Sequence, residues 1–517
     1  MPINQRKKLS INTNDGISNN VNLERRYHTM QMQTVSSQPS LSKSKHVLIV
    51  GGSFAGLCAA RHLSNHKDLD ITVIEPRKVF EYVPGACHLL AGSKAYNELI
   101  TPIEQCLPKK VKHVQGLFIG LKPNKLQALI KPIPLNEEDN NNKVVETFVS
   151  KNIVEIDYDA IIICTGRGYT TPIRSSEEGR TFDGRISEIE KKRELVHDAN
   201  SILVIGGGLV GVELAADIAS RSKKFLEKKQ EIVLISRSQL LNTLPKKAGI
   251  YATKWFEKKN VSVSVFDEIF DTKNGVVTTK NGLECKPDVI FDCTGRDFSS
   301  SPKELKNITL LTTNSFVSPY DDKGFLIVDD FLQSSEYPNL QIFGAGDVIK
   351  HENGVAFAYD ATDLDTYGVK SPMPFVRNAH LAESQAELVA QNVAKLLKIQ
   401  HGDAISNTKL HRYPEDVFGV KLSPLLSCVS LGPRYGIVVF NNLVLGGVLL
   451  GILGSLVKFL IERSKIAEIR NKTWGRAFWA FGHVVSNFIH RTMCFFSKKS
   501  KKNISETPKQ PLLSANI

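Results

Sequence analysis

The stretch HVLIVGGSFAG at residues 46–56 decides the fold of this 517-residue chain. Its first five residues form an apolar run typical of a buried parallel strand, and the glycine turn after them leads into a helix rich in Ala and Leu. A second strand follows at residues 71–74 and ends in Glu75, 24 positions after Gly51. This order of strand, glycine turn, helix, strand and acid is typical of a dinucleotide-binding β-α-β unit.

Each small residue of the turn has a predicted task. Gly51 permits the tight turn, and Gly56 lets the helix pack closely on the strand. Ser53 is small enough for a diphosphate to approach the N-terminus of the helix. Glu75 has the spacing that places a carboxylate on a ribose hydroxyl.

The same pattern recurs about 155 residues later. Residues 201–205 are apolar and lead into GGGLVG at residues 206–211, and a further strand is predicted at 231–235. Here all three glycine positions, Gly206, Gly208 and Gly211, are filled. Two such units predict two dinucleotide sites, and two sites in one chain imply electron transfer between their cofactors.

The second unit lacks the acid at its strand end. Ser236 and Arg237 stand where Asp or Glu would select an unphosphorylated ribose. We therefore predict that NADPH is accepted as well as NADH, with Arg237 available to pair with a 2′-phosphate. The alternative, that Arg237 is only a solvated charge, stays open.

Three further strands end in small residues. Residues 156–164 lead into Thr165-Gly166, and residues 288–293 lead into Thr294-Gly295. Small residues suit a chain that crosses between domains beside a cofactor. The third strand, near residues 339–343, leads into GAGD at 344–347, which places Asp347 to accept a hydrogen bond from a ribityl hydroxyl.

In their order, these motifs resemble the FAD-dependent pyridine nucleotide oxidoreductases, a family that includes type II NADH dehydrogenases and apoptosis-inducing-factor-like proteins. The resemblance covers about residues 46–400. Within the family the chain resembles the apoptosis-inducing factor 2, or ferroptosis suppressor, subfamily. That narrower resemblance rests on the first glycine loop, on SLGPR at 430–434 and on the tail around Lys458 and Trp474.

The resemblance implies an α/β fold with two nested Rossmann-like domains and a C-terminal membrane-facing region. The implied FAD residues are Gly51, Gly52, Ser53, Phe54, Ala55, Gly56, Glu75, His88, Phe118, Asp347 and Arg377. His88 stands where relatives carry a flavin-contacting Arg, Phe118 would offer backbone contact near the adenine, and Arg377 opens a helix aimed at the isoalloxazine ring. The NAD(P)H residues are Gly206, Gly208, Gly211, Glu213 and Arg237. Glu213 would help to position the nicotinamide, although a helix-start carboxylate is an equal alternative.

The predicted domains follow the motifs. We expect a disordered basic N-terminus (1–45), an FAD domain (46–168 and 297–410), an NAD(P)H domain (169–296), a C-terminal domain (411–502) and a tail (503–517). The insertion at residues 137–142 is predicted to form a loop.

The electron acceptor separates three hypotheses. The first is an NAD(P)H oxidoreductase that passes electrons through FAD to a membrane quinone. The second is a peroxide or disulfide reductase that uses Cys87, twelve positions after Glu75, but GACHL at residues 85–89 differs from the pattern around the redox cysteine of such enzymes. The third is a redox-regulated, nucleic-acid-binding cell-death factor.

The charge favours the first hypothesis. The chain carries a net charge of +13, yet residues 1–45 contribute +5 and residues 458–502 contribute +9, which leaves −1 for residues 46–457. At the C-terminal end, Trp474, Phe478, Phe481, Val485 and Phe488 recur at helical steps amid the basic residues. An aromatic stripe with a basic flank is typical of a helix in a membrane interface, so we predict membrane contact through residues 435–496 and regard nucleic acid as unlikely. The alternative is a helix docked on the protein's own core.

Several segments bear on location. Residues 435–457 carry no charge and have the length of a membrane span, but two Asn and five Gly weaken that interpretation, and the resemblance implies a strand pair that leads into a helix. Pro2 follows Met1, so we expect no N-myristoyl anchor of the kind that close relatives carry. RRY at 25–27 resembles a mitochondrial processing site, whereas Asp15 and Glu24 are unusual in a presequence. We expect an intracellular membrane location, on a lipid droplet or a mitochondrial membrane.

The cysteines lie at least eight positions apart, so no zinc site or dithiol pair is predicted.

Overall fold

The structure is a computed structural model. It describes residues 44–133, 153–169, 173–221, 230–295, 316–352, 378–399, 409–413, 426–440, 443–446, 448–482 and 484–485. The chain divides into two compact parts, Met1–Ser44 and Lys45–Ile517, and all elements below, including both Rossmann-like units, belong to the second part. The predictions for the N-terminal segment, the 137–142 loop, Arg377, Phe488 and the 503–517 tail lie outside the described residues.

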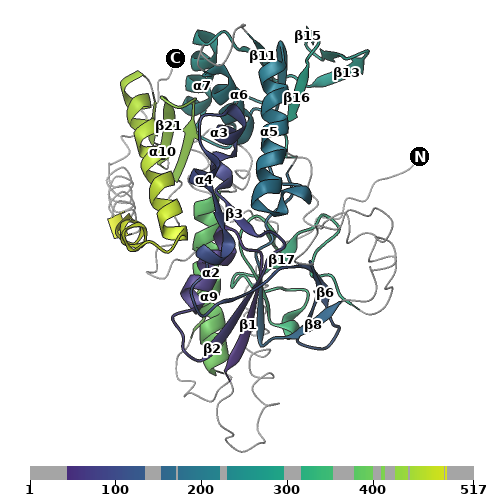
Figure 1. The fold of residues 1–517 in the computed structure, drawn as a ribbon, viewed down its shortest axis with the longest axis vertical. Helices are drawn as coiled ribbons and strands as arrows, with labels where there is room; N and C mark the ends of the chain where they lie inside the picture. Colours follow the sequence, from purple (N-terminus) through teal and green to yellow (C-terminus); the bar gives the residue numbers. More distant parts are fainter. Residues whose placement is uncertain are drawn as a thin grey trace, which may run out of the picture. The chain divides into compact units, whose positions relative to one another are not determined.

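Two parallel sheets form the centre of the fold (Figure 1). The first has the strand order β18-β9-β1-β2-β5, and the second has the order β12-β11-β10-β16. The first comprises β1 (Lys45–Val50), β2 (Leu69–Ile74), β5 (Lys112–Val114), β9 (Ala160–Ile163) and β18 (Ile342–Gly344). The second comprises β10 (Ser201–Ile205), β11 (Glu231–Ser236), β12 (Ser262–Val265) and β16 (Val289–Asp292).

In sequence order, the strands of the first sheet both precede and follow those of the second sheet: β1, β2, β5 and β9 come before it, and β18 comes after it. Ile342–Gly344 pairs in parallel with Ile161–Ile163, so the chain returns to the first sheet after it has built the second. This confirms the predicted α/β fold with two Rossmann-like units. The predicted domains and their boundaries stay predictions.

Helices connect the parallel strands. They are α2 (Phe54–Leu63), α3 (Ala86–Ala91), α4 (Tyr96–Leu99), α5 (Phe182–Asp198), α6 (Leu209–Ala219), α7 (Lys246–Lys258), α9 (Ala379–Ile399) and α10 (Val448–Ile469). Short 3-10 turns are η1 (Val83–Gly85), η2 (Ile103–Gln105), η3 (Glu178–Arg180) and η4 (Pro338–Leu340). Helices α2 and α9 pack against each other, and α3 packs on both α5 and α6 (Figure 1).

Smaller sheets surround the two units. One antiparallel sheet contains β6 (Gly116–Leu121), β7 (Gln127–Pro132) and β8 (Val154–Asp157). A second contains β13 (Ile269–Lys273), β14 (Val276–Thr279) and β15 (Glu284–Cys285). A third contains β20 (Leu426–Ser430), β21 (Gly436–Phe440) and β22 (Leu443–Leu445). Two-stranded pairs join β3 (Val79–Glu81) to β4 (Ile100–Pro102) and β17 (Leu326–Val328) to β19 (Ile349–His351).

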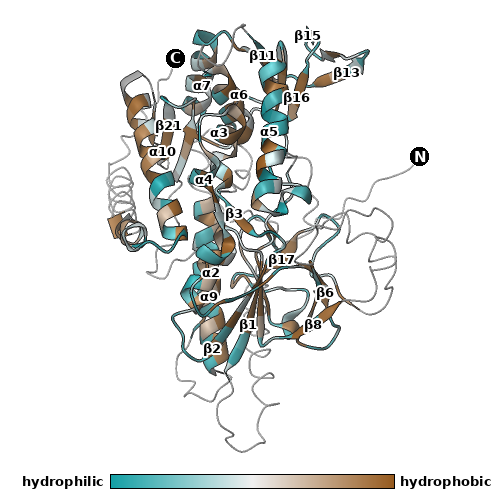
Figure 2. Ribbon diagram, in the orientation of Figure 1, coloured by the Kyte–Doolittle hydropathy of each residue, from teal (hydrophilic) through white to brown (hydrophobic). Residues whose placement is uncertain are grey.

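The uncharged segment 435–457 forms strands and the start of a helix. Within the described part of it, β21 and β22 are followed by the first residues of α10, as the resemblance implied. No helix among the described residues is both long and apolar enough to cross a membrane. Figure 2 shows apolar residues over much of the first half of α10, in contrast to the largely polar α5.

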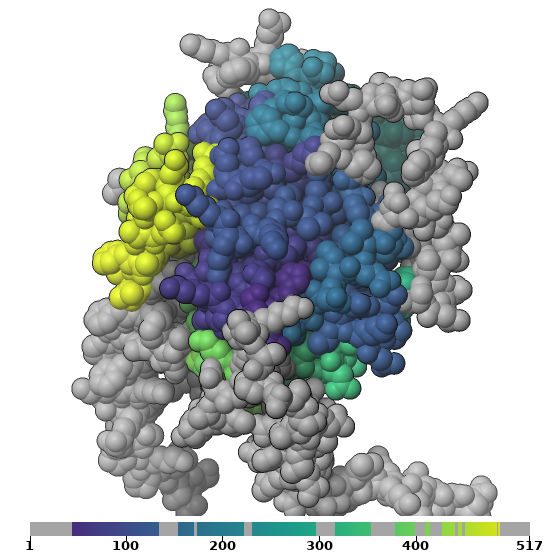
Figure 3. Space-filling model, turned by 60° about the horizontal axis from the view of Figure 1, so that its bottom comes forward, coloured from purple at the N-terminus to yellow at the C-terminus, as the bar shows by residue number. Residues whose placement is uncertain are grey.

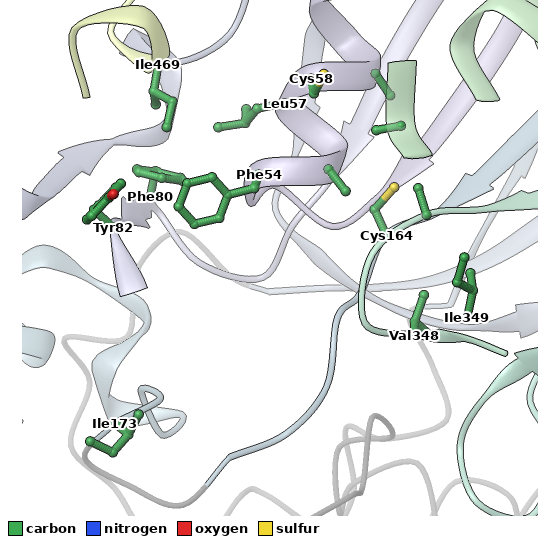
Figure 4. Close-up of a cluster of buried hydrophobic side chains, with 14 of the residues drawn as sticks. Phe54, Leu57, Cys58, Phe80, Tyr82, Cys164, Ile173, Val348, Ile349 and Ile469 are labelled. Atoms are coloured by element: carbon green, nitrogen blue, oxygen red, sulfur yellow. The ribbon is translucent and has the colours of Figure 1, made fainter. Parts of the chain in front are cut away.

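One hydrophobic core runs through both units. Near the first glycine loop, the Phe54 ring meets the rings of Phe80 and Tyr82 edge to face, with centroids 5.3 and 5.7 Å apart (Figure 4). These contacts hold the first turn of α2 against β3, so the loop is supported by the core beneath it.

Candidate functional site

The first glycine loop has a shape that only glycine allows. Gly51 has a φ of +110°, and a Cβ there would lie 2.4 Å from the carbonyl oxygen of Cys164. A Cβ on Gly56 would lie 1.8 Å from the Gly51 oxygen. Ser53, the N-cap of α2, makes no side-chain capping bond, so the first backbone N–H groups of the helix suit an anion such as a diphosphate.

Glu75 lies beneath this loop at the end of β2. Its carboxylate accepts hydrogen bonds from the backbone N–H of Gly52 (2.6 Å) and from Nε of Arg77 (2.7 Å). Burial alone would raise the pKa of Glu75, but the Arg77 guanidinium and these hydrogen bonds hold it below its ordinary value. The carboxylate is therefore ionised and fixed beside the loop.

The second loop repeats this geometry. Gly206 has a φ of +117°, and a Cβ on Gly211 would lie 1.9 Å from the Gly206 oxygen. Gly208 lies on the open side, where a Cβ would meet nothing within 4 Å. The predicted correspondence between the two units therefore extends to the shape of their turns.

A cavity of about 870 Å³ joins the two units. Of the predicted site residues, Gly51, Ser53, Phe54, Ala55, Glu75, Cys87, Phe118, Glu213 and Asp347 line it. Gly52 and Gly56 pack behind the first loop. Gly206, Gly208, Gly211 and Arg237 lie outside the lining, and Arg377 lies outside the described residues.

The sequence reasoning missed four arginines on the cavity wall, which are Arg77, Arg167, Arg174 and Arg180. Arg77 and Arg174 both line the cavity near the first loop. Burial and the nearby Arg77 charge lower the pKa of Arg174. A bound anion would offset both the desolvation of the Arg174 charge and its repulsion by Arg77, so this part of the wall fits a diphosphate.

The start of α9 forms another part of the wall. Asn378, Ala379 and His380 line the cavity, and Asn378 Oδ1 accepts a hydrogen bond from the Leu381 N–H. Gly346, next to Asp347, donates its N–H to Gln385 Oε1 at 2.9 Å. The predicted helix is present and its N-terminus reaches the cavity.

The C-terminal region closes the cavity from the opposite side, through Ser427 and Cys428 of β20 and Lys458, Ile461 and Lys465 of α10. The Lys458 ammonium pairs with the Glu213 carboxylate, which also accepts the Ser430 N–H at 2.7 Å. Burial alone would lower the pKa of Lys458, but Glu213 raises it above its ordinary value. Helix α10 thus contributes a cation to the part of the cavity wall that Glu213 of α6 forms.

A second lysine of α10 lies farther along this wall. Lys465 Nζ lies 2.7 Å from Glu383 of α9 and 2.5 Å from Glu468, and 3.8 Å from the centre of the Trp479 ring, which also lines the cavity. Lys458 and Lys465 are seven positions apart, a spacing that puts both on one face of a helix. This spacing is a sequence signal that could have identified the cavity-facing side of α10.

His88 faces away from the lining. Its Nδ1 lies 2.8 Å from Oδ2 of Asp217, and both side chains are buried between α3 and α6. The structure thus places the His88 ring against α6.

Cys87 lines the cavity as a thiol. Its Sγ donates to the Val210 carbonyl oxygen at 3.8 Å, and burial, together with the Glu213 charge, raises its pKa well above the usual range. A thiolate, the reactive form, is disfavoured at this position.

The outer face of α10 is apolar. Its exposed large apolar side chains are Leu450, Ile452, Leu453, Leu456, Phe459 and Leu460. The next helical residues, 473–482, expose Trp474, Phe478 and Phe481, while Val485 is half-buried. Figure 3 shows the C-terminal residues at the molecular surface, in yellow. The described part of the predicted aromatic stripe is therefore largely solvent-facing.

Comparisons with known proteins agree with this architecture. A family model described as pyridine nucleotide-disulphide oxidoreductase matches residues 45–374. Apoptosis-inducing factor homolog B of Dictyostelium discoideum is 23% identical over 416 residues, which cover 77% of this chain and 89% of that protein. Ferroptosis suppressor protein 1 of Taeniopygia guttata is 24% identical and covers 60% of this chain and 78% of its own length.

Solved structures share the fold at low identity. The sulfide:quinone oxidoreductase of Aquifex aeolicus aligns with a TM-score of 0.58 at 18% identity, over 84% of this chain and 93% of its own. NDH2 of Plasmodium falciparum, in complex with NADH, aligns with a TM-score of 0.55 at 15% identity, over 83% and 99%. An engineered water-forming NADPH oxidase bound to NADPH aligns with a TM-score of 0.50 at 18% identity, over 76% and 74%.

Proposed function

Because this protein belongs to the pyridine nucleotide-disulphide oxidoreductase family and is an FAD-dependent NAD(P)H oxidoreductase, we propose that it passes electrons from NAD(P)H through FAD to a quinone at a membrane surface. The observation that carries the proposal is the single cavity. The first glycine loop, Glu213 of the second unit and Lys458 of α10 all line it.

We assign the FAD site to the first loop. Gly51 and the N-terminus of α2 would hold the diphosphate, with Arg77 and Arg174 as countercharges, and Asp347 would accept a hydrogen bond from the ribityl chain. Glu75 would face the adenosine ribose. When bound, FAD supplies hydride acceptance from NAD(P)H and two-electron delivery to the acceptor.

The chain's own residues would orient the reactants and exclude water. Glu213 follows the second loop on α6 and would position the nicotinamide side of the donor. Lys458 holds a proton at Nζ beside it, and the protonated state is favoured by the Glu213 charge. Because a raised pKa makes the Lys458 ammonium a weaker acid, we assign it the role of a fixed positive charge beside the reacting groups and not that of a proton donor.

The acceptor assignment draws on the C-terminal wall. Helix α10 lines the cavity with Lys458, Ile461 and Lys465 and exposes Leu453 and Leu456 on its outer side. One helix would thus contact both the reaction site and a lipid surface, where an apolar quinone dissolves. The Aquifex protein of the same fold is a sulfide:quinone oxidoreductase, which supports the same acceptor class here. We propose that the protein is located on a mitochondrial membrane or on a lipid droplet, and cell fractionation would distinguish the two locations.

The donor assignment includes NADPH. This chain has SRS at residues 236–238, at the end of β11, where a carboxylate would repel a 2′-phosphate. The engineered oxidase of the same fold was solved with NADPH bound, so the fold can accommodate that phosphate. The missing acid and the adjacent arginine therefore support acceptance of NADPH as well as NADH.

Two alternatives are disfavoured. The raised pKa of the Cys87 thiol works against a single-cysteine peroxide or disulfide reductase. The helical spacing of Trp474, Phe478 and Phe481 gives one apolar face, which suits lipid better than stacked nucleobases.

Steady-state turnover of the full-length protein tests the acceptor. We expect NAD(P)H oxidation with a short-chain quinone, weak turnover with peroxide, and less than a twofold change in quinone turnover in Cys87→Ser. Loss of quinone turnover in Cys87→Ser with bound flavin retained would favour the cysteine mechanism. Peroxide turnover above quinone turnover would overturn the quinone assignment.

A further inference from the structure

Helix α3 carries a buried histidine that lies outside the cavity lining. His88 Nδ1 lies 2.8 Å from Asp217 Oδ2 of α6, and the two side chains are 8% and 0% exposed. Among the described residues, neither atom makes a hydrogen bond to any other group, so each is the other's polar partner. A buried ionised carboxylate with one polar contact is costly unless that contact carries a proton. The pair therefore suits a shared proton where α3 packs on α6 (Figure 1).

Asp217 connects this pair to the cavity. Glu213, one helical turn earlier on α6, lies on the same face of the helix and lines the cavity. Both carboxylates act on the same two neighbours. Burial lowers the pKa of Lys458, but Glu213 and Asp217 raise it above its ordinary value, and burial together with the same two charges raises the pKa of Cys87. The two carboxylates therefore share one electrostatic environment at the cavity wall.

His88 connects the same pair to the surface. Its carbonyl oxygen accepts hydrogen bonds from the N–H (2.9 Å) and from Oγ (3.2 Å) of Ser93, an exposed residue just beyond the end of α3. The His88 side chain also keeps an exposed fraction that Asp217 lacks. The imidazole is therefore the end of the pair that exchanges protons with solvent, a task for which histidine is the usual side chain.

The cations around the pair are unsuited to this task. Arg221, just after α6, donates from Nε to a carbonyl oxygen at the end of α3, and Arg193 of α5 lies against the C-cap of α3. Arginine does not release its proton in proteins. Lys458 is paired with a carboxylate, and its raised pKa makes it a weaker acid. The transferable proton at this contact therefore belongs to His88 and Asp217.

The proposed reaction requires one proton from solvent. NAD(P)H delivers a hydride, which amounts to two electrons and one proton, whereas a quinone becomes a quinol by taking two electrons and two protons. One further proton per turnover must therefore reach the cavity. It is consumed in the second half-reaction, when the electrons pass on to the quinone.

We propose that His88 and Asp217 relay this proton from solvent to Glu213 at the cavity wall. This inference rests on the proposed function, since it supplies the proton of the same reaction. His88 takes up the proton at its ring and passes it to the Asp217 carboxylate. From there the proton moves along α6 to Glu213, across the roughly 5–6 Å between Cβ atoms one helical turn apart, a gap that one water molecule can bridge. The quinone takes the proton from Glu213, so each turnover leaves the three side chains unchanged.

Stopped-flow measurement of the two half-reactions of the full-length flavoprotein tests the relay. His88→Gln and Asp217→Asn are each expected to slow reoxidation by a short-chain quinone by about tenfold or more and to leave reduction by NADH within about twofold. Reoxidation by ferricyanide, which takes electrons and no proton, should also stay within about twofold. His351→Gln is the matched control, because His351 is similarly buried, lies 2.9 Å from Asp330 and is absent from the cavity lining.

A spectroscopic readout tests the pair without turnover. The ring ¹⁵N NMR signals of His88, identified by their loss in His88→Gln, should shift in Asp217→Asn, whereas those of His351 should stay in place. Signals of His88 that do not move would show that the ring and the carboxylate share no proton, and would overturn the relay.

The kinetic outcomes separate the relay from the reaction it serves. Equal slowing with quinone and ferricyanide, or unchanged quinone reoxidation, would overturn the relay and leave the proposed function intact. His88→Gln decides between these outcomes if Asp217→Asn loses bound flavin. Wild-type protein whose reduced flavin is not reoxidised by quinone would instead contradict the proposed function.

Discussion

Gly56 and Gly211 are the residues at which the proposed FAD site and the proposed NAD(P)H site can be tested separately. Each lies under the first glycine of its own loop, and a Cβ would approach a backbone oxygen to 1.8 Å at Gly56 and 1.9 Å at Gly211. Neither approach is possible without displacement of the loop, because both neighbours are backbone atoms. Under the proposed assignment of the two loops, the two positions would affect different cofactors through the same steric conflict.

Substitution at the two positions is expected to give opposite phenotypes. Gly56→Ala should reduce bound flavin at least tenfold, whereas Gly211→Ala should keep flavin and slow its reduction by NAD(P)H at least tenfold. Flavin absorbance per protein and anaerobic reduction rates measure the two effects. Gly482→Ala, where a Cβ meets nothing within 4 Å, is the control. Full flavin content in Gly56→Ala would contradict the assignment of the first loop.

Glu75 makes stability depend on pH at this loop. Because its pKa in the folded protein lies below the ordinary value of 4.5, its contribution is fully present above pH 4.5 and is lost as the pH falls through the folded-state pKa. Glu75→Gln removes one partner of a buried ion pair, at a cost of about 3 kcal/mol. We expect the thermal midpoint of wild type to exceed that of Glu75→Gln at pH 7 and the gap to narrow below pH 4.5. A gap that widens on acidification would be inconsistent with an ionised Glu75.

At the scale of elements, α10 has two faces with different tasks. Inward, Lys458 and Lys465 reach the cavity. Outward, the helix exposes leucines. Its C-terminal end is fixed to the nucleotide fold, since Arg470 donates to Thr101 Oγ1 at 2.9 Å and Asn471 donates to the Gln105 oxygen at 3.0 Å. The outer face can therefore be altered without loosening the inner one.

Charges on the outer face should disturb membrane contact alone. Leu453→Asp with Leu456→Asp is expected to weaken binding to vesicles of phosphatidylcholine and phosphatidylserine at least tenfold, because each buried leucine contributes about 2 kcal/mol. Turnover with a water-soluble quinone should stay within twofold. Leu195→Asp, an exposed leucine on α5, serves as the control in vesicle flotation. Unchanged flotation of the double variant would remove α10 from the membrane contact.

The same helix marks the limit of prediction from sequence. Both β-α-β units were predictable, because their strands, turns and helices follow one another within short stretches. The pairing of Lys458 with Glu213 spans 245 positions and depends on how β20 packs on α6 and how α10 packs on β20, which no local pattern encodes. His88 illustrates the converse, because a sequence position taken from relatives does not fix the direction of a ring, which here faces Asp217.

For the whole molecule, the basic surplus and the chemistry belong to different parts of the chain. Residues 46–457 carry −1 of the +13 net charge, and this stretch contributes both glycine loops. Helix α10 leads from that neutral body into the basic C-terminal region, with Lys458 at the boundary. The cavity, which Trp479 also lines, and the basic, aromatic segment are thus adjacent in the fold, which suits an enzyme that takes a soluble donor and a lipid-soluble acceptor.

The most direct test of this account is an anaerobic spectral titration of the purified full-length protein. NADH or NADPH should bleach the visible absorbance of the flavin, and a short-chain quinone added afterwards should restore it with one quinone reduced per flavin. A protein that contains no flavin, or a reduced flavin that quinone leaves bleached, would contradict the central claim.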